Sequence, residues 1–258
     1  MKAITYTKPF LFFWTRTVRV PVPDSFGELS ADQLRIILNI LHNGTSKRQI
    51  QLCVLAVLLR KKSLFAITPF TESLSAKCML GGKVKRQIEH LTDWIIKSKW
   101  ELERNPYPQL AGLYASDLER VSASEFMEIM GHFQAYHAKR EEADLNKLLG
   151  SLYRTEGTDF DQEKVSEYAD RFSRVSMDYK RLVVIWLETE MDCWAKTFPS
   201  VFGGGSKGKS KFGWFDTIKS ISADDFGTIE QKENTPMSKL LMSLEIDMAN
   251  AKKAKANV

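Results

Sequence analysis

The pattern of apolar and polar positions changes near the start of the chain, from an alternating pattern to a helical one. Valines at positions 18, 20 and 22 alternate with Arg19 and prolines, which is typical of edge strands, so we expect one or two strands over residues 10–22. From residue 30 onward, apolar residues recur every three or four positions, which indicates helices. The sequence therefore predicts a mainly α fold: a helical bundle with a short N-terminal β segment.

Two segments carry the pattern that begins a helix. Ser30 with Gln33, and Ser122 with Glu125, each have the spacing of a capping box. They predict helices over residues 30–41 and 122–139, and we expect the first to end at Asn43-Gly44 in a left-handed turn. The periodicity predicts further helices at about 47–61, 84–102, 142–153, 162–173 and 176–198. The last of these is apolar on nearly all sides at 182–187, which predicts a central position in the bundle.

The composition changes after residue 200. Residues 201–211 are rich in Gly, Ser and Lys, which is typical of a flexible linker. Beyond it we expect a short helix at 213–221 and a terminal helix that begins at Thr235-Pro236. The sequence thus predicts an α-helical globular domain over 1–200, a linker over 201–211 and a helical, partner-binding C-terminal extension over 212–258.

The terminal helix has apolar positions spaced alternately by four and three, as in a heptad seam. Two interpretations remain open: the seam packs onto the bundle, or it binds a helix of another protein. Two heptads are marginal as an isolated helix, so this helix would gain order by docking. The candidate partner-binding residues are Trp214, Phe215, Met237, Leu241, Leu244 and Met248.

Composition limits the class of protein. The chain has 258 residues, of which 43% are hydrophobic and 11% aromatic, so it can form a full core and is not predicted to be disordered. Its apolar runs are much shorter than the roughly 20 residues that cross a membrane, and no secretory signal pattern is visible. Three widely spaced cysteines form no C-x-x-C pair. Two of them, Cys53 and Cys193, lie in apolar helical runs, where cysteine acts as a small hydrophobic residue. We expect a cytoplasmic protein with reduced thiols.

The net charge of +5 is mild, and the excess of positive charge is local, with three lysines in the predicted linker and three more near the C-terminus. Charges in such segments usually keep them solvated, so the pattern does not favour nucleic-acid binding. A DNA-binding replication or regulatory module that uses the Lys-rich tether stays open as an alternative.

Residues 203–210 match the phosphate-binding pattern G-x-x-x-x-G-K-[ST] through Gly203, Gly208, Lys209 and Ser210. The pattern is meaningful only between a buried strand and a helix. Here the preceding residues predict a helix, and too little chain follows to bury such a strand. We therefore interpret the match as a coincidence of composition.

No other pattern indicates catalysis or metal binding. The four histidines have no metal-ligand spacing, and no G-x-S-x-G nucleophile elbow occurs. We predict a protein that is not an enzyme and has no metal, cofactor or catalytic residues. The histidines are His42, His90, His132 and His137.

Two stretches resemble proteins of long-tailed bacteriophages. An "LYR" helix end at 148–154 is followed by Glu156-Gly157 and Phe160-Asp161 and, further on, by a helix that is apolar on nearly all sides. This order is similar to that in phage tail-region proteins. The C-terminal stretch has Trp214-Phe215, an acidic turn at 223–226 and a "TPM..LL..L" helix from Thr235. It is similar to segments of tail-assembly chaperones, and together the two stretches cover less than half of the chain.

The resemblance implies a non-enzymatic role in phage or prophage tail assembly. Such a chaperone covers the long, helical, aggregation-prone tape-measure protein and recruits tail-tube subunits in the host cytoplasm. The implied partners are therefore a tape-measure-like helical protein and a tail-tube protein, with self-association also open. A structural neck or baseplate adaptor that stays in the virion is the second interpretation.

Overall fold

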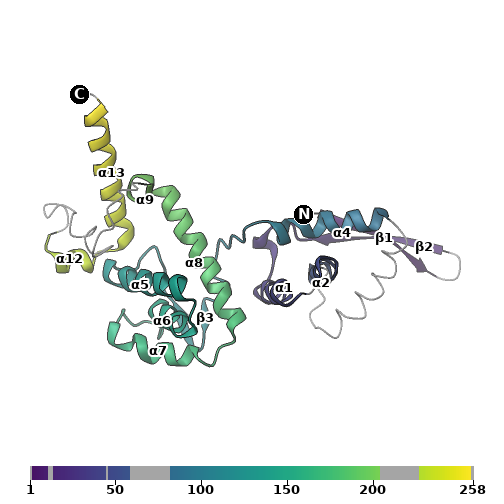
Figure 1. The fold of residues 1–258 in the computed structure, drawn as a ribbon, viewed down its shortest axis with the longest axis horizontal. Helices are drawn as coiled ribbons and strands as arrows, with labels where there is room; N and C mark the ends of the chain where they lie inside the picture. The colour runs from purple at the N-terminus through teal and green to yellow at the C-terminus, as the bar shows by residue number, and fades with distance from the viewer. Residues whose placement is uncertain (1, 11–13, 45, 59–81, 204–226, 257–258) are drawn as a thin grey trace. The chain divides into compact units, whose positions relative to one another are not determined.

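The computed structural model describes residues 2–10, 14–44, 46–58, 82–203 and 227–256 (Figure 1). The fold is mainly α, as predicted. The chain divides into two compact units. The first comprises residues 1–106 with 181–189, and the second comprises 107–180 with 190–258. The predicted linker lies almost wholly outside the described residues, as does the helix predicted at 213–221.

The first unit begins with a two-stranded antiparallel hairpin. Strand β1 (Lys2–Phe10) pairs with β2 (Trp14–Val22), in a register that sets Lys2 opposite Val22 and Phe10 opposite Trp14. The alternation at 18–22 correctly indicated β2. Strand β1 precedes the predicted segment and was missed, although its residues 4–7 alternate between Ile or Tyr and Thr, a pattern typical of a strand.

Helix α1 (Ala31–Asn43) begins where the capping box predicted. The Ser30 Oγ accepts from the Gln33 backbone N–H at 3.2 Å, and the Gln33 side chain accepts from the Ser30 N–H at 3.1 Å. The left-handed turn predicted at Gly44 is wrong, because its φ is −72°. Glycine is needed there for space instead: a Cβ would lie 2.3 Å from the Ile50 side chain and 2.7 Å from the Ile40 carbonyl oxygen.

Helix α2 (Lys47–Leu58) packs against both α1 and α4 (Gly82–Lys97). Most of its second half is buried, from Gln51 to Leu58. The 3-10 turn η1 (Phe26–Glu28) places Phe26 beside Trp94 of α4, with ring centroids 5.2 Å apart. The continuous apolar run of α2 thus supplies much of the core of the first unit.

The second unit is built around α6 (Glu142–Leu152), which packs against α5 (Ala123–Lys139) on one side and α7 (Val165–Phe172) on the other. Gly150 allows the approach to α7, because a Cβ there would lie 2.5 Å from the Val165 carbonyl oxygen. The short 3-10 turn η2 (Gln162–Lys164) leads into α7. The buried residues on these helices include Phe126, Ile129, Leu145, Leu148, Leu149 and Phe172.

A small antiparallel sheet, absent from the sequence prediction, lies in the second unit. Its order is β3 (Gln109–Leu110), β4 (Leu113–Ala115), β5 (Tyr153–Arg154). Ala111 and Gly112 form the β3–β4 turn with φ angles of 54° and 73°, both left-handed. Strands of two or three residues are too short to show any alternation, so the sequence carries no signal for them.

The remaining helices are α8 (Met177–Thr197), α9 (Pro199–Gly203), α12 (Ile229–Glu233) and α13 (Met237–Ala256). Five residues of the apolar run in α8 are buried: Leu182, Val183, Val184, Trp186 and Leu187. By contrast, Cys193 on the same helix is exposed, so its predicted role as a small core residue is wrong. Within the residues the structure describes, no helix is both long and apolar enough to cross a membrane.

Candidate functional site at the C-terminal helix

The phosphate-loop match does not have the structural context it requires. Gly203 is the last residue of helix α9, whereas a phosphate-binding loop follows a strand. The other matching residues, Gly208, Lys209 and Ser210, lie outside the described residues. Among the described side chains, no group of three or more His, Cys, Asp and Glu residues could hold a metal ion.

The predicted partner-binding residues on α13 are placed mainly in the core of the second unit. Met237, Leu241 and Leu244 are buried, and Met248 is half-buried. Trp214 and Phe215 lie outside the described residues. The first half of α13 therefore packs onto its own unit, which is the first of the two interpretations of the heptad seam, and it contacts α9 and α5 (Figure 1).

Backbone hydrogen bonds attach the first turn of α13 to the start of α5. Ser122 and Pro236 form an isolated antiparallel β-bridge. Beside it, the Ala123 N–H donates to the Thr235 carbonyl at 3.0 Å, and the Met237 N–H donates to the Val121 carbonyl at 2.9 Å. These bonds satisfy backbone groups that a helix start would otherwise leave open. The entry of α13 is thereby held at a defined position.

Glu245 makes a second attachment in the middle of α13. Its carboxylate accepts from the backbone N–H of Ser200, at 2.8 Å, and from that of Val201, at 3.1 Å. A carboxylate on the first N–H groups of a helix satisfies unpaired donors and complements the helix dipole. Glu245 therefore joins α13 to the start of α9. The sequence signals this role only through an acidic residue within the apolar pattern of the helix.

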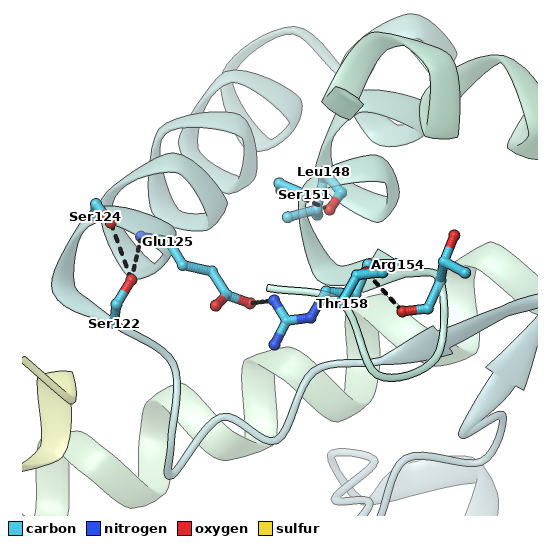
Figure 2. Close-up of polar contacts among 8 residues, drawn as sticks. Ser122, Ser124, Glu125, Leu148, Ser151, Arg154 and Thr158 are labelled. Atoms are coloured by element: carbon cyan, nitrogen blue, oxygen red, sulfur yellow. Dashed lines mark hydrogen bonds and ion pairs between the residues drawn. The ribbon is translucent and has the colours of Figure 1, made fainter. Parts of the chain in front are cut away.

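A polar cluster of Ser122, Ser124, Glu125 and Arg154 stabilises the start of α5, the helix that α13 contacts (Figure 2). The Ser122 Oγ accepts from the Glu125 N–H at 3.2 Å and lies 2.9 Å from the Ser124 Oγ. The reciprocal half of the predicted capping box is not formed, because the Glu125 carboxylate instead accepts from Arg154 at 2.7 Å. Glu125 is only 3% exposed, so this pair compensates a charge that would be costly to bury alone.

Other polar groups beside this cluster are used by the fold. The Ser151 Oγ donates to the Leu148 carbonyl at 2.9 Å, and the Thr158 Oγ1 donates to the Thr155 carbonyl at 2.8 Å (Figure 2). A nucleophile would need a neighbouring base, but these hydroxyl groups donate to backbone carbonyls. These contacts indicate that the cluster positions α5 and β5.

Two of the four histidines, His132 and His137, lie on α5 and make contacts within the fold. The His132 Nε2 lies 3.0 Å from a Glu128 carboxylate oxygen one helical turn earlier, and Gln162 donates to the other oxygen of Glu128 at 3.2 Å. The His137 ring packs edge-on against Phe133, with centroids 4.3 Å apart. These contacts connect η2 to α5 and suit a packing role for both side chains.

The outer face of α13 has a different character from its buried face. Met242 is 61% exposed and Ile246 is 55% exposed, the two highest values among the large hydrophobic residues described. They lie one turn apart, so they share a face of the helix. Beyond Leu244, none of the residues from 245 to 251 is buried. The second half of the helix is thus less buried than the first and carries exposed apolar side chains.

Comparisons with profiles of known protein families, with curated proteins and with solved structures find no match to this chain.

Proposed function

We propose that the protein is a non-enzymatic assembly factor of phage or prophage origin that binds a long helical partner of the tape-measure type. In this role it covers the partner's apolar helices in the host cytoplasm and helps to recruit tail-tube subunits. The proposal joins the resemblance of residues 148–178 and 214–244 to tail-assembly proteins with one structural observation.

That observation is the two-faced character of α13. One face, with Leu241 and Leu244, is buried in its own unit, while Met242 and Ile246 face outward. A helix that is anchored along one side and apolar on another can pack against a second helix without having to fold first. Anchoring therefore lowers the entropy cost that makes a free helix of this length a poor binder.

The polar contacts support a binding role more than a chemical one. The buried ion pair of Glu125 and Arg154 and the carboxylate of Glu245 all connect elements of the fold to one another. These contacts hold α5 and α9, against which α13 packs, in fixed positions, and this helps a binding surface keep its shape.

The test is co-expression of the full chain with the product of a long, helix-rich reading frame that neighbours its gene. We expect a complex on size-exclusion chromatography with light scattering, and a larger soluble fraction of the partner than when the partner is expressed alone. If the partner's solubility is unchanged and no complex forms, the proposed function is wrong. Recovery of the chain from purified virions would instead support the structural adaptor.

A further inference from the structure

The most exposed apolar side chains on α13 form a short stripe, which we define as Met242, Ile246 and Ala249. Successive members lie four and three residues apart, so they follow one face of the helix. Met242 and Ile246 are mostly exposed and Ala249 is half-buried. The seam predicted from sequence, through Leu241 and Leu244, faces the protein's own core and is not accessible to a partner.

Lysines lie on both sides of this stripe along the helix. Lys239 precedes it and is exposed, and Lys252, Lys253 and Lys255 occupy the last turns. The acidic residues of α13 are Glu245 and Asp247, so the helix carries four lysines against two acids, a net of 4 − 2 = +2. Glu245 is already engaged by the N–H groups of α9, which leaves Asp247 as the acidic residue on the open part of the helix.

The charges along α13 indicate which kind of helix could bind to the stripe. A second copy aligned in parallel would bring Lys239 opposite Lys239. A second copy in the antiparallel direction, centred between Met242 and Ala249, would bring Lys239 opposite Lys252. Like charges set opposite each other at an interface oppose association. A helix with apolar residues between acidic ones would instead gain both apolar burial and opposite charge.

We propose that the stripe is a docking surface for an amphipathic helix of another protein, one that carries Asp or Glu on both sides of its apolar residues. This inference rests on the proposed function for the identity of the partner, but the chemistry of the surface can be tested without it. The partner helix would lie along the outer face of α13, while the opposite face of α13 stays in the core.

The first experiment uses the full chain and two fluorescent synthetic helices of about 20 residues, long enough to be helical on binding. Both have the same Leu and Ala stripe, flanked by Glu in one peptide and by Lys in the other. We expect fluorescence anisotropy to show binding of the acidic peptide, at least about tenfold weaker binding of the basic peptide, and weakening of the acidic complex by salt. Equal or tighter binding of the basic peptide would overturn the proposal.

Single substitutions locate the surface. Met242→Glu and Ile246→Glu should each weaken binding of the acidic peptide by about tenfold or more, because each buries a like charge at the centre of the contact. Ala251→Glu is the matched control: it adds the same charge at an exposed position of the same helix and should change binding by less than about threefold. Unchanged thermal melting of all three variants confirms that they are folded. Equal effects of all three substitutions would refute the assigned surface.

Two further measurements distinguish the proposed partner helix from a second copy of the chain and from a lipid surface. If the free chain is a dimer by light scattering and Ile246→Glu makes it a monomer, the stripe is a self-association surface and the proposal is wrong. If the chain binds phosphatidylglycerol vesicles, loses this in Ile246→Glu and binds neither peptide, the surface is for lipid and the proposal is also wrong. The inference can fail separately from the proposed function: a complex with the tape-measure-type protein that survives Ile246→Glu refutes the stripe alone.

Discussion

The close approach of α6 and α7 depends on Gly150, and this yields a sharp prediction for Gly150→Ala. A Cβ at this position would lie 2.5 Å from the Val165 carbonyl oxygen and 2.8 Å from the Ala169 backbone nitrogen. Both neighbours are backbone atoms, so they cannot rotate away as a side-chain end could. Ordinary contact begins at 3.4 Å, so the helices would have to separate by about 0.9 Å at this point.

The magnitude follows from two opposing effects. Alanine is favoured over glycine in a helix interior by up to about 1 kcal/mol. Overpacking of a tight interior costs about 1–3 kcal/mol, and here it also weakens the dispersion contacts of neighbouring buried residues such as Leu149. Because two backbone atoms must move, we expect overpacking to prevail, with a net loss of about 1–2 kcal/mol in the free energy of unfolding of the second unit.

Gly131 in α5 provides the matched control. It is also in a helix of the second unit, but apart from its chain neighbours and its own helix backbone no atom lies within 4 Å of an added Cβ, so Gly131→Ala should stabilise by about 0.5–1 kcal/mol. The assay is urea unfolding followed by circular dichroism, with amide hydrogen exchange of α6 and α7 peptides to assign the effect to this unit. If Gly150→Ala stabilises as much as Gly131→Ala does, the reasoning about the contact is wrong.

Three further substitutions test other parts of the fold by the same urea assay. Ala111→Asn should stabilise by about 0.5–1 kcal/mol, because asparagine adopts the left-handed φ of 54° more readily than alanine, and a destabilised variant would contradict the turn geometry. Leu241→Ala should cost about 2–4 kcal/mol, whereas Met242→Ala should change stability by less than about 0.5 kcal/mol; equal effects would show that α13 is not seated on its unit. Asp93→Asn should cost at most about 0.5 kcal/mol at pH 7, since the hydrogen bond from Lys97 lowers the pKa of the Asp93 carboxyl in a largely exposed pair. Because the folded-state pKa of Asp93 lies below its ordinary value, the stabilisation is present at neutral pH and is lost as the pH falls through the folded-state pKa. The difference between Asp93→Asn and the unchanged chain should therefore shrink as the pH is lowered below the ordinary range of an aspartate, and a difference that does not shrink would refute the assignment.

Local signals in the sequence were sufficient for much of the helical structure. The Ser30 capping box, the apolar periodicity of α5 and α6 and the run at 182–187 all act over a few neighbouring residues, so they can be read without knowing the fold. The alternation at 18–22 indicated β2 for the same reason. The mainly α class follows from these local patterns.

Features that depend on distant partners could not be read in this way. Glu125 has the spacing of a capping-box residue, yet its carboxylate pairs with Arg154, 29 residues away. Gly44 follows a helix, as a left-handed cap would, yet it is required by the approach of Ile50. For Glu125 the local rule named a plausible partner and a tertiary contact replaced it, whereas for Gly44 the reason is the close start of the next helix and not a left-handed φ.

The C-terminal helix shows the same division most clearly. Its presence and heptad spacing follow from the sequence, because a 3.6-residue period places Leu241 and Leu244 on one face. Which face meets the core and which meets solvent depends on the positions of α5 and α9. Ser122 at the start of α5 forms a β-bridge with Pro236, and backbone N–H groups of α9 donate to the Glu245 carboxylate. Periodicity defines an apolar face, but only tertiary packing decides whether that face is already occupied, because burial is a property of the neighbours and not of the helix alone.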